Sequence, residues 1–431
     1  MYDELTNEDA EGYLAMLRPP AQPDSSERGM IEGGERAGFA EFVALMATFM
    51  SLVALSIDAM LPALGEIGRE LGAGHPNSVQ LVVSVMFLGM AAGQLFYGPL
   101  SDSLGRKPAL LAGLALYAAG CLISLFSRSF PVMLAGRLVQ GLGAAGPRIV
   151  SIALIRDRYE GPRMARVMSL VMAIFIAVPI VAPALGQGIL LVASWRTIFG
   201  VFLSIAAVAS VWFTLRQGET LAPGRRIPFT RSRIVGGLRE VLGNRTAVGY
   251  AATAGLVLGA SVGYLSTAQQ VFQEQYGLGR LFPLYFALLA TALGTASLLN
   301  AHLVTRFGMR PLARGALLAV AGLSVTFFAI SCVSSGHPPL WALVAYLFGV
   351  FLFQGTLFGN LTALAMKPLG HIAGMGAAVV GALSTFISAL GGIAIGRAYD
   401  GTVLPLVAGF GGLALAALAV MSWTEPADRL T

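Results

Sequence analysis

Long apolar segments recur along the chain and alternate with short polar breaks. Six of them fall near residues 39–64, 78–98, 108–126, 130–155, 164–192 and 194–215, and six more near 246–270, 282–303, 312–333, 338–364, 374–395 and 403–423. The hydrocarbon core of a bilayer requires about 20 consecutive apolar residues per helix. The pattern therefore predicts an all-α polytopic membrane protein with about twelve transmembrane helices.

The composition supports a membrane protein, and the charge distribution predicts its orientation. Of the 431 residues, 56% are hydrophobic and only 12% are charged, whereas soluble domains carry about 25% charged residues. The net charge of +6 raises the possibility of a nucleic-acid partner. If the N-terminus is cytoplasmic, however, the inner loops hold 17 Lys and Arg residues and the outer loops hold 5. Such an asymmetry is typical of membrane topology, so we expect both termini in the cytoplasm and no nucleic-acid binding.

The predicted spans divide into two sets of six. We expect an acidic, disordered leader, a six-helix bundle, a cytoplasmic linker, a second six-helix bundle and a short tail, at residues 1–38, 39–215, 216–245, 246–423 and 424–431 respectively. The sequence LGRKP at Leu104–Pro108 is echoed by FGMRP at Phe307–Pro311, after the second span of each half. Repeated bundles of this kind favour a secondary transporter with its binding site between the halves.

The linker contains a candidate amphipathic helix. In the stretch RSRIVGGLREVLGNR, the residues Ile234, Leu238, Val241 and Leu242 fall on one helical face, and the arginines lie elsewhere. This pattern is typical of a helix at the membrane interface. An ordinary solvated linker helix explains the pattern nearly as well, so both interpretations stay open.

Two charged side chains inside the spans are candidates for proton coupling. Asp58 lies about six residues from the outer end of the first span and Arg137 about seven from that of the fourth. At about 1.5 Å per residue the two lie at similar depth, and we expect them to pair. An arginine remains charged, whereas a buried carboxylate beside it can bind and release a proton. We therefore predict that Asp58 carries the proton and that Arg137 tunes it. The alternatives are a purely structural ion pair and an Asp58 that lies high enough in the span to be hydrated and inert.

A second arginine, Arg148, lies eleven residues after Arg137 and projects from the same face of the helix. Gly141 and Ala144 lie between them on that face and permit close helix packing. Arg148 either contacts substrate or reaches the charged cluster RDR at 156–158, and the sequence favours neither.

The loop after the second span carries a recognisable motif. It reads GPLSDSLGRKP and matches the major facilitator signature G-x-x-x-D-x-x-G-R-K through five residues, Gly98, Asp102, Gly105, Arg106 and Lys107. The chain thus resembles a major facilitator transporter from about residue 39 to 423. The resemblance implies the major facilitator fold, two pseudo-symmetric six-helix bundles, and a latch of these five residues that holds the two halves together on the cytoplasmic side and is remade in each transport cycle. In the fourth span, Arg137 followed by QGLG resembles a second signature of the family.

The fifth span and three shorter stretches narrow the resemblance to one branch. The sequence AVPIVAPALGQG contains Pro179, Pro183, Gly186 and Gly188 and is similar to the helix-bending antiporter signature, although two of its glycines are replaced. The stretches IDAMLPAL, RDRY and HIAGMGAAVVGAL are similar to the bicyclomycin and chloramphenicol resistance (Bcr/CflA) branch of proton-driven drug exporters. The resemblance implies export of drugs in exchange for protons.

The second half offers uncharged polar residues among apolar ones. As pocket residues we expect Tyr264, Gln269, Tyr285 and Gln354, together with Arg148. A mostly apolar pocket suits lipophilic ligands that are neutral or weakly cationic. The sequence therefore predicts proton-coupled efflux of lipophilic drugs by alternating access across a bacterial inner membrane. The alternatives are a transporter of a native metabolite, such as a sugar or amino acid, and a non-transporting receptor on the same fold.

Other chemistry is not indicated by the sequence. It contains no phosphate-binding loop, no paired cysteines for a metal and no nucleophile with a suitable base. We therefore expect no enzyme activity, no metal and no cofactor, with the proton gradient as the driving force. The expected partners are a drug-like molecule, protons and membrane lipids, and the expected state is a monomer. Cys121 and Cys332 are expected to be buried and unpaired.

Overall fold

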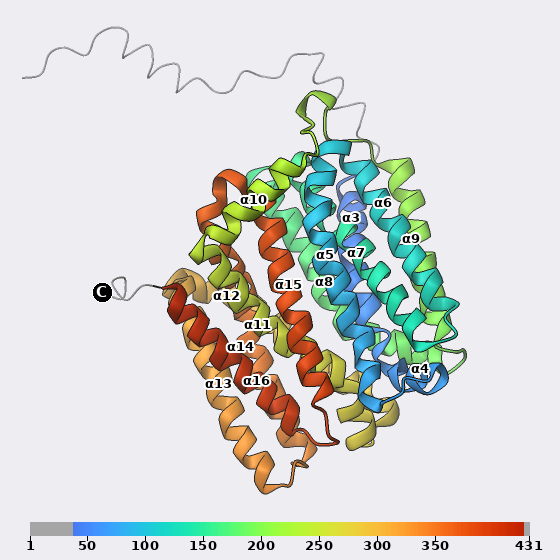
Figure 1. Cartoon of the computed structure of the whole chain (residues 1–431), viewed down its shortest axis with the longest axis vertical. Helices are drawn as coiled ribbons and strands as arrows, with labels where there is room; N and C mark the ends of the chain where they lie inside the picture. Colours follow the sequence, from blue (N-terminus) through green and yellow to red (C-terminus); the bar gives the residue numbers. More distant parts are fainter. Residues whose placement is uncertain (1–37, 426–431) are drawn as a thin grey trace, which may run out of the picture.

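The computed structural model describes residues 38–425, so the expected leader, apart from Gly38, and nearly all of the expected tail lie outside the described residues. Within that range the structure is all-α, with twelve long helices packed side by side and short helices between them (Figure 1). The long helices are α3 Phe39–Asp58, α5 Leu81–Leu104, α6 Arg106–Leu125, α7 Phe130–Arg158, α8 Gly161–Leu190, α9 Arg196–Arg216, α11 Arg245–Gln269, α12 Phe282–Phe307, α13 Met309–Val333, α14 Leu340–Met366, α15 Ala373–Arg397 and α16 Leu404–Thr424.

These helices confirm the predicted all-α polytopic fold. Eleven stretches of the described chain are long and apolar enough to cross a membrane, and one of them, Leu340–Arg397, contains both α14 and α15. The two are joined by the 3₁₀ segment η6 Lys367–Ile372, where Leu369 departs from helical geometry. The predicted spans therefore correspond one to one with the long helices, with shifts of a few residues at most ends.

The first long helix ends six residues before the predicted end of its span at Leu64. α3 ends at Asp58, and two turn residues lead into η1 Leu61–Ala63 and α4 Leu64–Leu71. Pro62, in the first turn of η1, has no N–H to continue the hydrogen-bond ladder of α3. The chain therefore bends directly after Asp58, and this bend places the carboxylate at a helix end.

Within the first half, glycine allows α5 and α7 to pack closely. A Cβ atom on Gly141 would lie 2.1 Å from the carbonyl oxygen of Met86 in α5. Gly141 therefore serves the close packing that its position predicts. The same face of α7 carries Arg137 towards α3 and α5.

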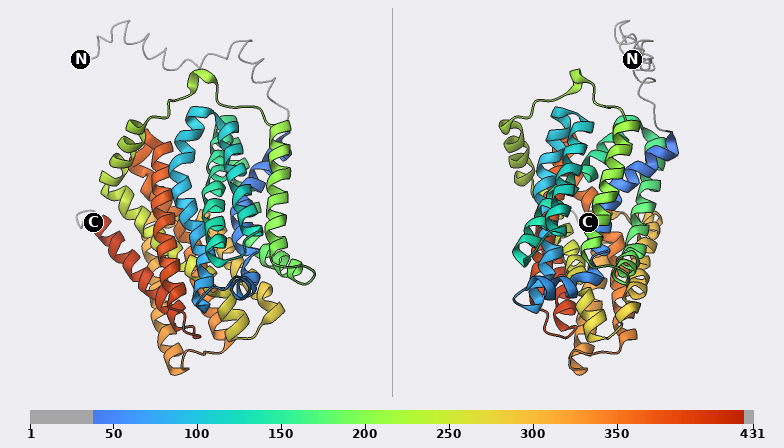
Figure 2. Two further views of the ribbon diagram at one scale, coloured as in Figure 1. Left: turned by 45° about the vertical axis from the view of Figure 1, so that its right-hand side comes forward. Right: turned by 90° about the vertical axis from the view of Figure 1, so that its right-hand side faces the viewer.

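The two halves meet along α5 and α15, which lie side by side in Figures 1 and 2, and along α8 and α12. Gln94 Nε2 of α5 donates to Thr385 Oγ1 of α15 at 2.9 Å. At the end of the bundle away from the linker, Asn77 Nδ2 donates to the carbonyl oxygens of Arg397 at 3.1 Å and Tyr399 at 2.5 Å. Gln80 Nε2 also donates to Gln270 Oε1 there. At that end, therefore, the halves are joined by hydrogen bonds.

The linker runs over the other end of the bundle and contains η3 Pro223–Arg225 and α10 Arg231–Gly243 (Figures 1 and 2). α10 packs against α15 and α11. Val241 is buried there, and Leu238 packs beside it. Leu242, however, is half exposed. The expected apolar face is therefore split, because its two ends differ by about 100° around the helix.

Candidate functional site

Asp58 lines a cavity between the two halves. Its side chain is only 4% exposed, and the cavity has a volume of about 150 Å³. The other lining residues come from four helices: Pro179 of α8, Ser261, Tyr264 and Leu265 of α11, Phe286, Leu289, Ala290 and Leu293 of α12, and Phe351 of α14. This space holds a few water molecules at about 30 Å³ each. Ligand pockets usually measure about 300–1,000 Å³, so the cavity as it stands is too small for a drug-sized molecule.

The cavity is lined by polar groups from both halves, Asp58 from the first and Ser261 and Tyr264 from the second. Within residues 38–425, the Asp58 carboxylate makes no ion pair or hydrogen bond with another described residue. The buried hydroxyl of Tyr264 likewise has no hydrogen-bond partner in the described part of the chain. Its ring lies against Phe351, edge to face at 4.9 Å, and stacks on Phe286 at 5.8 Å. Buried polar groups left unpaired are costly, and the Asp58 carboxylate and the Tyr264 hydroxyl are the two groups of the cavity that the described residues leave without a hydrogen bond.

Arg137 does not pair with Asp58, contrary to the prediction. The guanidinium is fully buried. It donates to the carbonyl oxygens of Val82 at 3.0 Å and Ser56 at 3.2 Å, and to Gln140 Oε1 at 2.6 Å. Asp58 follows Ser56 by two residues, which turns it by about 200° around α3. Arg137 therefore hydrogen-bonds the backbone of α3 two residues before Asp58 and does not pair with the carboxylate.

Arg148 does not join the charged cluster at the end of α7. Asp157 Oδ2 accepts hydrogen bonds from Arg106 and Thr220 instead. Arg148 is half-buried, and it makes no hydrogen bond or ion pair with any other residue of the described chain. It is not among the residues that line the Asp58 cavity.

The other expected pocket residues are dispersed. Gln354 lies behind the cavity wall, where its Oε1 accepts from Ser261 Oγ at 2.9 Å. Gln269 donates to Glu274 at 3.1 Å and lines a different cavity near α4. Tyr285 stacks on Phe272 at 6.2 Å. Of the five residues expected to form one pocket, only Tyr264 lines the Asp58 cavity.

The proline- and glycine-rich part of α8 packs on the turn that follows Asp58. α8 is continuous through Pro179 and Pro183, and Pro179 lines the cavity. A Cβ atom on Gly186 would lie 1.8 Å from the carbonyl oxygen of Ala59, whereas one on Gly188 would meet nothing within 4 Å. Gly186 is therefore required for the approach of α8 to the Asp58 turn, and Gly188 is not.

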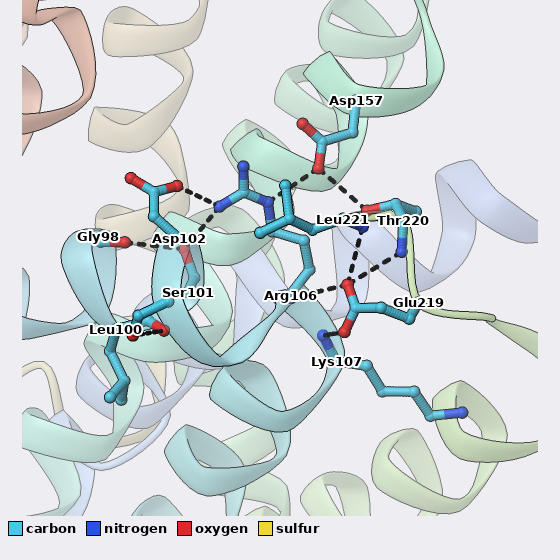
Figure 3. A network of polar contacts seen from close by, with 11 residues as sticks. Gly98, Leu100, Ser101, Asp102, Arg106, Lys107, Asp157, Glu219, Thr220 and Leu221 are labelled. Carbon is cyan, nitrogen blue, oxygen red and sulfur yellow. Dashed lines mark hydrogen bonds and ion pairs between the residues drawn. The ribbon is translucent and has the colours of Figure 1, made fainter. Parts of the chain in front are cut away.

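The charged motif between α5 and α6 forms a network at the linker end (Figure 3). Arg106 Nη1 lies 2.5 Å from Asp102 Oδ1, and Arg106 Nε lies 2.8 Å from Asp157 Oδ2. Arg106 therefore joins the end of α5 to the end of α7. Gly98, one α5 turn before Asp102, faces α15, since a Cβ atom there would lie 3.6 Å from Ala378.

Glu219 of the linker completes this network and was not predicted. Its carboxylate accepts the backbone N–H groups of Arg106 at 2.9 Å and Lys107 at 3.1 Å (Figure 3). These are the first two residues of α6, which starts after Gly105 at φ 109°. The N–H groups of a helix start have no partner inside the helix and favour an anion. The only signal in the sequence is an acid among turn formers, which also fits an exposed loop.

The described residues contain no group of three or more His, Cys, Asp or Glu side chains placed to hold a metal ion. The Asp58 cavity itself brings together a buried carboxylate and the aromatic rings of Tyr264, Phe286 and Phe351.

Comparison with known proteins identifies the family. Residues 37–394 match the family described as Major Facilitator Superfamily. The chain is 32% identical to an uncharacterized MFS-type transporter, YdgK, of Bacillus subtilis, over 83% of this chain and 88% of that protein. It is 28% identical to a bicyclomycin resistance protein homolog of Haemophilus influenzae, over 85% and 91% of the two chains. It is also 28% identical to a chloramphenicol resistance protein of Pseudomonas aeruginosa, over 84% and 83%.

Solved structures agree on the fold. The crystal structure of a D-xylose–proton symporter aligns with a TM-score of 0.69 at 14% identity, covering 91% of this chain and 99% of that one. The relatives include drug-resistance proteins, as the resemblance to the Bcr/CflA branch predicts. Together, the family match and the helical architecture establish that the chain belongs to the major facilitator superfamily of membrane transporters.

Proposed function

We propose that this transporter exports lipophilic, drug-like molecules in exchange for protons, across a bacterial inner membrane. Two relatives of nearly full length are named for resistance to bicyclomycin and chloramphenicol. The asymmetry of Lys and Arg between the loops favours cytoplasmic termini. The protein works as a monomer in this proposal, with the proton gradient in place of any cofactor.

The main support for proton coupling is the buried carboxylate of Asp58. It is a buried carboxylate without a partner in the described chain, and it lies where α8 of the first half meets α11, α12 and α14 of the second. A charge in such a place is unfavourable unless water, a cation or a proton accompanies it. Opening the cavity to one side or the other changes the hydration of the carboxylate. Proton uptake and release thereby follow the alternating access of the two halves.

The size of the cavity explains why the proton and the drug bind in different conformations. At about 150 Å³ it accommodates a proton on Asp58 but not a drug. A drug requires the halves to move apart, which also wets the carboxylate. Exchange follows because the closed form tolerates the neutral acid and the open form allows it to ionise.

Flux in proteoliposomes tests the function. We expect an imposed proton gradient to drive accumulation of radiolabelled chloramphenicol by the wild-type protein, and a collapsed gradient to abolish it. Asp58→Asn should show no gradient-driven accumulation, while retaining exchange of internal for external chloramphenicol. Gradient-driven accumulation by Asp58→Asn at the wild-type rate would contradict the role of the carboxylate. Absence of any flux with chloramphenicol or bicyclomycin would contradict the proposed substrate class.

A further inference from the structure

α10 has an exposed face that is both apolar and basic. Arg231, Val235, Arg239 and Leu242 lie within about 80° of one another around the helix, since each residue adds about 100°. Val235 is 48% and Leu242 50% exposed, and both arginines are exposed. These four residues are called the α10 stripe below. Val241, on another side of the helix, is 1% exposed against the second half, so the fold uses a different face for packing.

The C-terminal end of α10 lies at the level of the membrane interface. α11, a candidate span, begins at Arg245, directly after Asn244, which follows α10. The Arg245 guanidinium lies 4.7 Å from the ring centroid of Trp423 and donates to its carbonyl oxygen. Trp423 is 53% exposed at the end of α16, another candidate span. Exposed tryptophans at the ends of spans gather at the headgroup level of a bilayer, so this end of α10 lies beside lipid headgroups.

The cations of the stripe are not neutralised by the acid of α10. Glu240, the one acidic residue of the helix, lies about 140° from Val235 and accepts from His371 Nε2 at 2.5 Å. Gly237 marks that side as a packing face too, because a Cβ atom there would lie 2.4 Å from Met375. The stripe therefore presents positive charge and apolar surface to the same surroundings.

We propose that the α10 stripe is a binding surface for anionic phospholipid headgroups. Val235 and Leu242 enter the boundary between headgroups and acyl chains, as in other interfacial amphipathic helices. Arg231 and Arg239 hydrogen-bond lipid phosphates, for which the planar guanidinium is well suited. The surface anchors the linker between the halves to the membrane. This proposal does not depend on the transported substrate or on proton coupling.

Site-directed fluorescence tests the position of the stripe. A polarity-sensitive dye is attached to Val235→Cys or, as a matched control one residue later, to Gly236→Cys, a position with open space around it. Both are made in full-length protein with Cys332→Ser, because Cys332 is the exposed native thiol of the described chain. In nanodiscs of mixed phosphatidylcholine and phosphatidylglycerol, we expect a blue shift and quenching by brominated lipid at 235 but not at 236. Equal solvent exposure of both positions would overturn the proposal.

Charge removal tests the preference for anionic lipid. Each arginine beside an anionic surface contributes about a fivefold change in affinity. Arg231→Gln with Arg239→Gln should therefore weaken phosphatidylglycerol binding to the purified protein by about 25-fold, as measured by titration and native mass spectrometry. Arg280→Gln with Arg397→Gln, at the opposite end of the bundle, is the control and should leave it unchanged. Equal binding by both double variants, or equal insertion of position 235 in pure phosphatidylcholine, would overturn the proposed recognition of anionic headgroups.

Discussion

The contact of α8 with the Asp58 turn gives the most quantitative prediction. In Gly186→Ala the added Cβ would lie 1.8 Å from the carbonyl oxygen of Ala59. Real Cβ contacts are essentially never shorter than 3.0 Å, so α8 and the turn would have to separate by about 1.2 Å. A backbone oxygen cannot rotate away as a flexible side chain can. Overpacking of this kind typically costs about 1–3 kcal/mol, which is about a 5- to 150-fold change in an equilibrium constant.

The matched control is Gly188→Ala, two residues along the same helix, where the new Cβ meets nothing within 4 Å. We expect Gly186→Ala to lower the thermal unfolding temperature in detergent and to slow chloramphenicol flux by at least about fivefold, since displacement of the turn also moves Asp58. Gly188→Ala should match the wild type in both assays or be slightly more stable, because alanine favours a helix over glycine. Identical behaviour of the two variants would refute the close approach of α8 to the Asp58 turn.

Three further predictions concern other parts of the structure. Glu219→Ala should lower the free energy of unfolding by about 0.5–2 kcal/mol, because the cap of α6 is lost. Glu160→Ala is the control and should leave it unchanged in a thermal unfolding assay, because Glu160 makes no side-chain cap bond at the start of α8. Tyr264→Phe should leave the free energy of unfolding nearly unchanged, because the Tyr264 hydroxyl has no partner in the described chain. Tyr346→Phe loses a 2.9 Å hydrogen bond to Ser324 and should lower it by about 1 kcal/mol. The opposite ranking would contradict the hydrogen-bond assignments. A membrane-impermeant maleimide should label exposed Cys332 from outside intact cells, and labelling only after lysis would reverse the proposed orientation.

The fold could be predicted from the sequence because hydropathy alone determines the spans. Each apolar segment is long enough to be a membrane helix and can satisfy its backbone only within itself. The ion pair of Asp102 and Arg106, in contrast, does not follow from helical spacing, because Gly105 separates α5 from α6 between the two residues.

The contacts of the site could not be predicted in the same way. Position along a span gives depth but not the direction in which a side chain points, so the expected pair of Asp58 and Arg137 was wrong. For the same reason, the sequence did not predict that Gln269 lines a different cavity and that Tyr285 packs on Phe272, away from the Asp58 cavity. Cys332 was expected to be buried and is exposed, because a span end does not pack on all sides.

Proton release from purified protein tests the central claim most directly, because it needs neither a membrane nor a gradient. Addition of chloramphenicol to weakly buffered wild-type protein in detergent near neutral pH should release protons, detected by a pH-sensitive dye. Asp58→Asn should bind chloramphenicol, as followed by calorimetry, and should release no protons. Equal release from both proteins, with equal binding, would show that the exchanged proton resides on another group.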